Sequence, residues 1–195
     1  MAPRAFLPGW GASPAVWEPF GASVPIGPGV EIVGWSLGAM HALEAAMTID
    51  VAGLVLVAGT PQFVRGGAWE LGWSPRILQR MLRVLDTDPD GLLDDFERSM
   101  FAPGEERVPF PRETDPDTLA AGLRYLDEVS LLGQVEGIEC PVRLLHGGAD
   151  RLIPVAAAET LAAALPHADL TVWAEAGHAP HLTQPDRFRA WLDAT

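Results

Sequence analysis

Two patterns of apolar residues alternate along the first third of the chain. Short apolar runs at Arg4 to Leu7, Val30 to Val33 and Val51 to Ala58 predict strands, and the last is nearly continuous, as in strands covered on both faces. Between them, Pro14 to about Phe20 and the helix-forming residues 39–46 predict helices. The order strand, helix, strand predicts a parallel sheet.

The last quarter of the chain returns to the same alternation. We expect strands at Val142 to Leu145 and at Leu170 to Trp173, with a helix at Pro154 to Leu165 between them. A loop at Glu175 to Pro180 and a closing helix at Asp186 to Asp193 follow. The predicted fold class is α/β, with about five parallel strands flanked by helices.

The segment 62–136 has a different pattern. Strand-like runs disappear, and helical stretches are separated by breaks that are rich in proline and glycine. Apolar residues recur at helical spacing, as at Ile77, Met81 and Leu85, so each helix has one face to bury. The expected helices are Pro75 to Leu85, Asp90 to Phe101 and Asp115 to Leu132.

Length and composition bound the domain organisation. A chain of 195 residues, of which 48% are hydrophobic, is long enough for one well-packed core and short for two. We therefore expect residues 1–61 and 137–195 to form one α/β core and residues 62–136 to form a helical lid inserted into it.

Charge and cysteine usage exclude several classes of function. A formal net charge of -13 excludes a general nucleic-acid binder, because phosphate backbones require a basic face. The single cysteine, Cys140, excludes an internal disulfide, and no clustered Cys and His spacing indicates a zinc site. In the N-terminal stretch, Pro8 and Gly9 interrupt the apolar run before it is long enough for the core of a signal peptide. No apolar run in the sequence is long enough to span a membrane. We expect a cytoplasmic monomer without membrane contact and without a metal or organic cofactor.

The pentapeptide Gly34-Trp35-Ser36-Leu37-Gly38 carries the candidate chemistry. This G-x-S-x-G pattern follows a predicted strand and precedes a predicted helix. In that context the chain turns sharply at the serine, and the hydroxyl stands clear of the backbone at the top of the sheet. Ser36 is therefore the candidate nucleophile.

Serine requires a base, and the base requires a third group that orients it. Asp150 follows the strand predicted at Val142 to Leu145, and His178 follows the strand predicted at Leu170 to Trp173. The chain order is thus serine, aspartate, histidine, the order found in hydrolases whose serine lies in a G-x-S-x-G turn. Each of Ser36, Asp150 and His178 is expected at the carboxyl end of a parallel strand. We expect them to form a catalytic triad.

The other histidines have simpler interpretations. His181 is near enough to His178 to be a rival base. His41 is expected to pack within its helix, His146 to make a structural hydrogen bond, and His167 to be solvated in a loop.

Acyl transfer also needs hydrogen-bond donors for the developing oxyanion. In this architecture they are backbone N–H groups, one from the residue after the nucleophile, Leu37, and one from the loop after the first strand, Trp10. The alternative interpretation of Trp10 is a core aromatic residue.

These residues resemble an α/β-hydrolase over essentially the whole chain. Four segments look more narrowly like the pimeloyl-[acyl-carrier protein] methyl ester esterases of biotin synthesis: Pro8-Gly9-Trp10-Gly11, Gly34 to Gly38, Ala58 to Phe63 and Ala176 to His181. By this resemblance Ser36, Asp150 and His178 match the family's triad, and Trp10 and Leu37 match its oxyanion positions. The implied reaction is hydrolysis of the methyl ester on a carrier-bound pimeloyl chain.

Two features depart from the family. Pro8 replaces the histidine that usually begins the oxyanion loop, and the interval from Trp10 to Ser36 is too short for a further strand and helix. Because every catalytic part is retained, we expect a compact natural variant of the fold rather than a fragment, with a consecutive parallel sheet and Pro14 to Phe20 in the first crossover.

The lid contains two sets of candidate binding residues. Arg76, Arg80 and Arg83 share one helical face in a stretch without acidic residues, which suggests a dock for an acidic acyl carrier protein, with Arg65 or Arg124 contributing. An ordinary solvated helix face is the alternative. The candidates for lining the substrate site, each of which could instead simply pack, are Phe63, Trp69, Trp73, Met81 and Phe101.

The sequence thus predicts a serine carboxylesterase acting on an acyl ester, most specifically the methyl ester of pimeloyl-[acyl-carrier protein]. A carboxylesterase of small free esters is the nearest alternative. An alternative of another class is a non-catalytic binding protein that keeps the fold.

Overall fold

Five parallel strands form one sheet in which the spatial order is the order along the chain, β1-β2-β3-β4-β5. The computed structural model describes residues 2–194. The predicted consecutive parallel sheet is confirmed. The strands are β1 Arg4–Leu7, β2 Glu31–Trp35, β3 Gly53–Val57, β4 Val142–Gly147 and β5 Ala168–Trp173.

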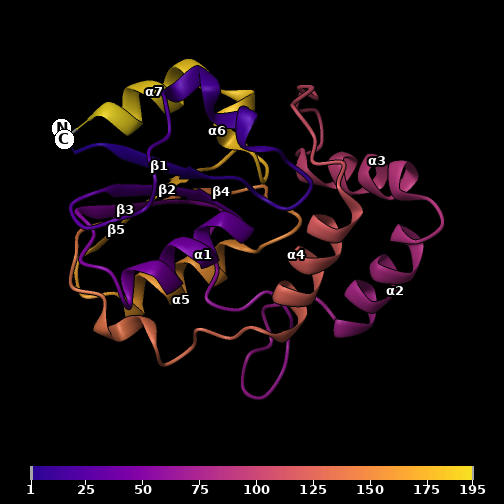
Figure 1. Ribbon diagram of the computed structural model, residues 1–195, viewed down its shortest axis with the longest axis horizontal. Coiled ribbons are helices and arrows are strands. Elements are labelled where there is room, and N and C mark those ends of the chain that lie inside the picture. The colour runs from indigo at the N-terminus through magenta and orange to yellow at the C-terminus, as the bar shows by residue number, and fades with distance from the viewer. Residues whose placement is uncertain (1, 195) are drawn as a thin grey trace.

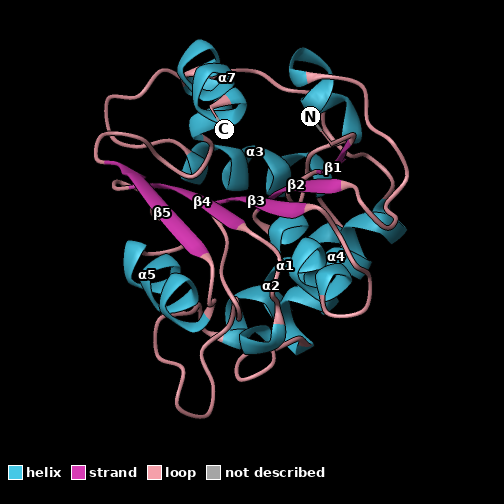
Figure 2. Ribbon diagram, turned by 90° about the vertical axis from the view of Figure 1, so that its left-hand side faces the viewer, coloured by secondary structure: helices cyan, strands magenta, loops and turns pink. Residues whose placement is uncertain are grey.

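Helices cover both faces of this sheet. Figures 1 and 2 show α1 (Leu37–Ala46) and α5 (Val155–Ala164) on one face, and α7 (Pro185–Asp193) on the opposite face. The short helix α6 (Pro180–Thr183) lies beside α7, where the sequence predicted the end of a loop. Every residue of β3 is buried, as expected for a strand covered on both faces.

The first crossover, where the sequence predicts a helix, is a 3₁₀ helix, η1 (Pro14–Phe20). Pro19 lies inside it, and proline removes the N–H that an α-helical turn would use. Ser13 stands at the N-cap position in extended conformation, but its side chain makes no capping hydrogen bond. The buried Trp17 anchors this crossover against the α7 face through Phe188, 6.1 Å away between ring centroids.

Between β3 and β4 lie the three helices of the segment 62–136. They are α2 (Pro75–Leu85), α3 (Pro89–Met100) and α4 (Pro116–Glu128), and they gather beyond one end of the sheet (Figure 1). The bounds of α2 are those predicted, whereas α4 ends at Glu128 because the chain turns to extended conformation at Val129. The 3₁₀ turn η2 (Val135–Gly137) then leads back to β4.

This helical segment is joined to the core by hydrogen bonds from two tryptophan side chains, the buried Trp10 and the half-buried Trp73. Trp10, in the loop after β1, donates its Nε1–H to the carbonyl of Leu119 in α4 at 2.8 Å. A Cβ on Gly122 would lie 2.8 Å from the Trp10 ring, so the glycine lets α4 approach the loop closely. Trp73, before α2, donates its Nε1–H to the carbonyl of Leu152 after β4, also at 2.8 Å.

Within residues 2–194, none of the helices has both the length and the apolar character that a membrane crossing requires.

Candidate active site

Ser36 lies in the sharp turn between β2 and α1. Its backbone has φ 55° and ψ -112°, a left-handed conformation that is strained for a residue with a side chain. Two glycines make the turn possible, because a Cβ on Gly34 would lie 2.3 Å from the carbonyl oxygen of Gly38, and one on Gly38 would lie 2.3 Å from that of Leu7. The Ser36 N–H donates to the carbonyl of Val57 in β3 at 2.9 Å, which ties the turn to the sheet.

Asp150 and His178 lie together in the loops that follow β4 and β5. The His178 Nδ1–H donates to Asp150 Oδ2 at 2.7 Å, and both side chains are buried. A carboxylate only accepts, so this bond places the ring proton on Nδ1 and leaves Nε2 able to accept a proton. The structure therefore brings the predicted acid and base into the relation that a triad requires.

Backbone amides hold the Asp150 carboxylate in place. Its Oδ1 accepts hydrogen bonds from Leu152 N at 2.8 Å and Ile153 N at 3.0 Å. Burial by itself would raise the pKa of Asp150, but the adjacent His178 and these hydrogen bonds outweigh burial and lower the pKa. Asp150 is thus an anion at neutral pH, able to stabilise a protonated His178.

His146 is a second imidazole beside Asp150. Its Nε2–H donates to the Ile153 carbonyl at 2.9 Å, the structural hydrogen bond expected of it, and lies 3.4 Å from Asp150 Oδ2. Burial lowers the pKa of His146, so the ring is neutral. The sequence did not reveal the contact with Asp150, although the spacing of four residues between them was visible.

The backbone of His178 is held on two sides. Trp35, the residue before Ser36, donates its Nε1–H to the His178 carbonyl at 2.9 Å. The His178 N–H donates to the carbonyl of Met100 at the end of α3 at 2.7 Å. The loop that carries the candidate base is therefore joined both to the strand that ends beside Ser36 and to the helical segment.

His181, the rival base, lies in an aromatic cage. Its ring stacks on Trp17 at 4.7 Å and meets Trp35 edge-on at 4.6 Å, and neither ring nitrogen has a hydrogen-bond partner among the described residues. Complete burial lowers the pKa of His181 to about 3. The ring is neutral and lacks the carboxylate partner that His178 has, so this geometry favours His178 as the base.

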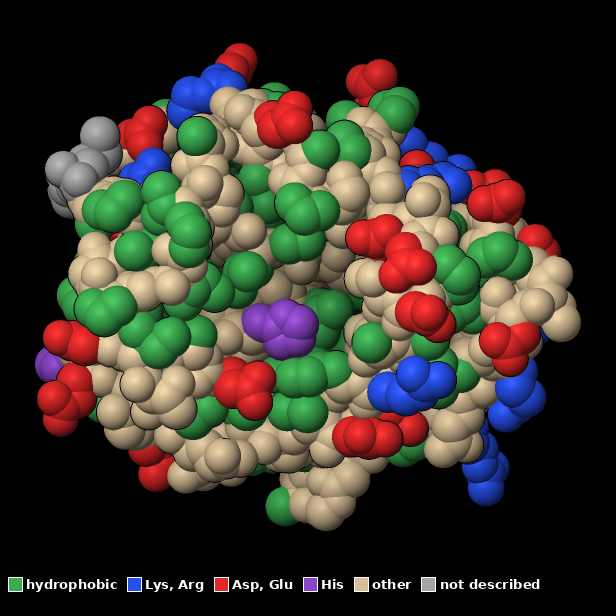
Figure 3. All heavy atoms as spheres, viewed as in Figure 1, with side chains coloured by type: hydrophobic (Ala, Val, Ile, Leu, Met, Phe, Trp, Pro, Cys, Tyr) green, Lys and Arg blue, Asp and Glu red, His purple; other side chains and the backbone are tan. Residues whose placement is uncertain are grey.

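The two remaining histidines make no recorded hydrogen bond with Ser36, Asp150 or His178 within the described residues, although His41 borders a pocket with Trp10 and Leu37. His41 is on α1, half-buried, with its ring edge against Tyr125 at 4.4 Å. His167 is exposed just before β5. On the face of the molecule drawn in Figure 3, one histidine side chain is visible near the centre, between the core and the helical segment.

The candidate oxyanion donors flank Ser36. Leu37 is the first residue of α1, and Trp10 is in the loop after β1, where a Cβ on Gly9 would lie 3.4 Å from the Ser36 Cβ. Within the part of the chain that the structure describes, neither the Trp10 N–H nor the Leu37 N–H donates to a protein acceptor. The Trp10 ring is buried against Phe96 at 4.7 Å. Core packing of its side chain and donation by its backbone are therefore compatible.

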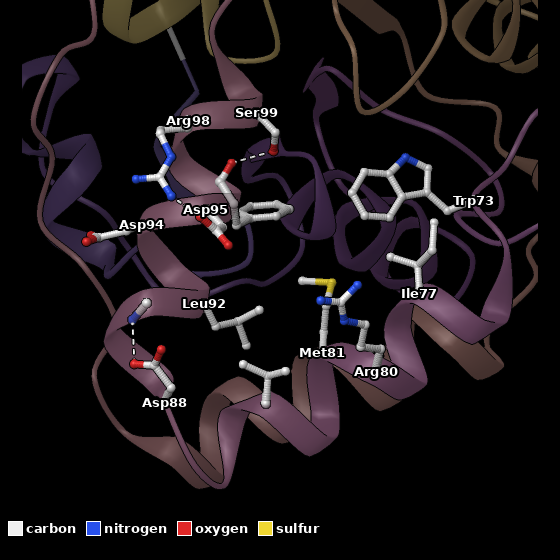
Figure 4. Close-up of a pocket in the computed structure, with 13 residues that line it drawn as sticks. Trp73, Ile77, Arg80, Met81, Asp88, Leu92, Asp94, Asp95, Arg98 and Ser99 are labelled. Atoms are coloured by element: carbon white, nitrogen blue, oxygen red, sulfur yellow. Dashed lines mark hydrogen bonds and ion pairs between the residues drawn. The ribbon is translucent and has the colours of Figure 1, made fainter.

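A groove of about 530 Å³ lies between α2 and α3 (Figure 4). Of the five residues predicted to line a substrate site, Trp73 and Met81 border this groove. Three of the five do not border it and are buried: Phe63, Trp69 and Phe101. Phe63 packs against Trp73, with 5.3 Å between the ring centroids. The other residues that border the groove are Ile77, Arg80, Val84, Asp88, Gly91, Leu92, Asp94, Asp95, Phe96, Arg98 and Ser99.

The predicted basic stripe lies along the exposed surface of α2, and its member Arg80 also borders the groove. Arg76, Arg80 and Arg83 are exposed, and none of them forms an ion pair within the described residues. In Figure 3 several basic side chains lie over the helical segment on the right of the face, with acidic side chains among them. Arg65 and Arg124 are also exposed, outside α2.

The connection between α3 and α4 lies over the site, which the sequence did not reveal. Phe110 meets the Trp35 ring edge-on at 6.1 Å, and Arg112 pairs with Ala12 as a short antiparallel bridge. Glu105, in the same connection, accepts a hydrogen bond from Gly177 N. This stretch has no hydrophobic periodicity and many prolines, so nothing in its pattern indicated what it would contact.

Comparison with known proteins identifies the family. The model of the alpha/beta hydrolase family matches residues 7–191. The chain belongs to the alpha/beta hydrolase family. The predicted fold and family resemblance are thereby confirmed.

Two curated relatives are each named pimeloyl-[acyl-carrier protein] methyl ester esterase. The protein from Nitrosomonas europaea is 33% identical over 175 residues, covering 84% of this chain and 69% of the relative. The protein from Stenotrophomonas maltophilia is 35% identical over 170 residues, covering 82% and 66%. The chain thus spans about two thirds of the length of these relatives, and they support the class of carboxylic ester hydrolase.

Solved structures share the fold at low sequence identity. The enol-lactonase from Burkholderia xenovorans LB400 has a TM-score of 0.81 at 18% identity, covering 98% of this chain and 90% of its own. In residues 2–194, no group of three or more His, Cys, Asp or Glu side chains is arranged as metal ligands would be.

Proposed function

We propose that this protein is a serine carboxylesterase, and that its substrate is the methyl ester of pimeloyl-[acyl-carrier protein]. The observation that carries the catalytic part is the buried His178–Asp150 pair, bonded at 2.7 Å, whose loop is joined to Trp35 next to the strained Ser36. A strained serine in a strand-to-helix turn and a tautomer that frees Nε2 are what a serine nucleophile requires.

In the first half of the reaction Ser36 Oγ attacks the ester carbonyl while His178 Nε2 takes the hydroxyl proton. The negative charge that develops on the carbonyl oxygen is received by the N–H groups of Leu37 and Trp10. Asp150 stabilises the imidazolium that forms, and His178 then protonates the departing methoxide. Methanol leaves, and the acyl group remains on Ser36.

In the second half a water molecule replaces the alcohol. His178 takes a proton from this water as it attacks the acyl-Ser36 carbonyl, and the same two N–H groups receive the oxyanion again. The bond to Ser36 Oγ breaks as His178 returns the proton to it. The products are the free carboxylate and the restored serine.

The substrate part of the proposal rests on the relatives' names and on the helical segment. The groove between α2 and α3, which none of Ser36, Asp150 and His178 borders, offers apolar side chains, among them Ile77, Met81 and Leu92, on which the far part of an acyl chain can lie. Beside it the exposed Arg76, Arg80 and Arg83 suit an acidic carrier protein or its phosphopantetheine phosphate.

The test is hydrolysis of two substrates by the purified protein. The kcat/KM for hydrolysis of pimeloyl-[acyl-carrier protein] methyl ester should exceed that for p-nitrophenyl butyrate. Ser36→Ala should abolish both activities. Faster turnover of the free ester would favour the small-ester alternative. Absence of hydrolysis of either substrate would favour a binding protein that keeps the fold.

A further inference from the structure

The connection between α3 and α4 makes backbone-level contact with the loop that carries His178. Glu105 Oε2 accepts hydrogen bonds from Gly177 N at 3.1 Å and from Ala102 N at 2.8 Å. The next amide, His178 N, donates to the Met100 carbonyl at 2.7 Å. Two consecutive amides of the loop that carries His178, here called the base loop, thus donate to one short stretch of the helical segment, residues 100–105.

Glycine at position 177 is what allows this contact. A Cβ there would lie 2.5 Å from the Met100 carbonyl oxygen and 2.6 Å from Glu105 Oε2, closer than any real contact. On the other side, a Cβ on Gly147 at the end of β4 would lie 1.9 Å from the Gly177 carbonyl oxygen. The base loop is therefore held between the end of the sheet and residues 100–105, with no side chain in either gap.

Glu105 holds both partners of this contact. One carboxylate oxygen receives an amide from its own stretch, Ala102, and one from the base loop, Gly177. Hydrogen bonds to a charged acceptor are stronger than neutral ones, and Glu105 is half-buried, so its bonds are partly shielded from water. Within the described residues, Glu105 is the acceptor recorded for the Gly177 amide.

We propose that Glu105 is a positioning residue for His178, which locks residues 100–105 onto the base loop. Asp150 fixes the His178 ring, whereas Glu105 and Met100 fix the backbone from which the ring projects. His178 Nε2 then faces Ser36 only while residues 100–105 contact the loop at Gly177 and His178. The position of the helical segment thereby controls the position of the base. This role rests on the proposed function, in which His178 is the base.

The experiment compares Glu105→Ala with Glu105→Gln and with Glu106→Ala. Glutamine keeps an oxygen that can accept both amides, and the exposed Glu106 is a matched neighbour without a recorded hydrogen bond. The readouts are amide hydrogen exchange at Gly177 and His178, kcat and KM for p-nitrophenyl acetate, and the thermal midpoint.

We expect Glu105→Ala to speed exchange of both amides and to lower kcat, each by about tenfold, the equivalent of one hydrogen bond. KM for the short ester should change less than twofold, because Glu105 does not touch the acyl chain. Glu105→Gln should recover most of kcat and of the protection, and Glu106→Ala should match the wild type.

Wild-type kcat and exchange in Glu105→Ala would overturn the proposal. So would equal losses in Glu105→Ala and Glu106→Ala, or a Glu105→Gln variant that is no better than the alanine variant, because either result means a general effect on the fold. Exchange needs no substrate, so the contact is tested even if Ser36→Ala keeps its esterase activity and the proposed function fails.

Discussion

The end of the sheet and the groove between α2 and α3 hold their polar side chains in different ways. At the sheet end Asp150, His178 and Trp35 are buried, and each has a fixed partner at 2.7–3.0 Å. In the groove Arg80 is exposed and has no ion pair among the described residues, and Asp88, Arg98 and Ser99 are each held only by a partner three residues away in the same helical turn. Fixed partners suit chemistry, which needs one geometry, and free side chains suit selection among substrates.

The comparison predicts where substitutions act. Changes at the sheet end should lower kcat on every ester, whereas changes at the groove should alter KM and depend on the substrate. The four predictions that follow run from the largest expected effect to the smallest.

Ser36→Ala, and separately His178→Ala, should lower kcat by about 10⁴-fold or more on any ester, because triad members act as a unit. The double variant should be little worse than either single one. Steady-state rates with p-nitrophenyl butyrate, together with circular dichroism to verify folding, are the measurement. A Ser36→Ala variant that keeps substantial activity would remove the serine from the mechanism.

His181→Phe should leave kcat within about threefold, because the ring lies outside the chemistry, but should change acid stability. The folded-state pKa of His181 is about 3, against 6.5 for the free side chain, so the unfolded chain alone takes up this proton as pH falls below 6.5. His181 therefore costs the folded state about 3 kcal/mol at pH 4.5, roughly a hundredfold in the unfolding equilibrium.

The check for His181 is urea unfolding at pH 7 and at pH 4.5. The phenylalanine variant should lose less stability than the wild type between the two values. Equal losses would mean that His181 is hydrated or protonated in the folded protein. A kcat loss as large as that of His178→Ala would reopen the choice of base.

Arg76→Glu combined with Arg80→Glu should slow hydrolysis of a carrier-bound ester by about tenfold at low salt, since rim charges chiefly act on association. Turnover of p-nitrophenyl butyrate should stay nearly unchanged. The measurement is kcat/KM for both substrates over a series of salt concentrations, in which the wild type should lose its advantage at high salt. Equal losses on both substrates would indicate a structural role for the arginines.

Trp73→Ala should raise KM for long acyl esters several-fold more than for acetate esters, at the scale of a lost apolar contact. Met81→Ala is the matched control, because Met81 borders the same groove but lacks the hydrogen bond from Trp73 to Leu152 beside the acid. A uniform fall in kcat confined to Trp73→Ala would mean that this bond, and not the groove, is what Trp73 provides.

Much of the sheet was predictable because its signals are local. The five strands, the helix at Pro75–Leu85 and the loops that hold Ser36, Asp150 and His178 follow from apolar runs, proline positions and chain order. The exact residues at which the strands end were less predictable. β2 runs on to Trp35 and β4 to Gly147, because glycines at these ends let neighbouring backbones approach, which depends on tertiary contact.

The surroundings of the site were not predictable from local pattern. That Trp73 and Met81 border a groove whereas Phe63, Trp69 and Phe101 do not depends on how three helices pack, since all five are apolar. The contact of Glu105 with Gly177 joins residues 72 positions apart, and a glutamate in a proline-rich stretch carries no sign of its partner. Such contacts follow from the fold as a whole.

The consecutive strand order also has a consequence for how the molecule folds. β1 pairs with β2 and β2 pairs with β3, so this half of the sheet can assemble from contacts of short sequence separation. The pairing of β3 with β4 must instead wait for the long segment between Val57 and Val142. We therefore expect an order of events during synthesis, in which the turn with Ser36 is in place early and the acid and base dock last. Esterase activity in a refolding reaction should accordingly lag behind the recovery of secondary structure.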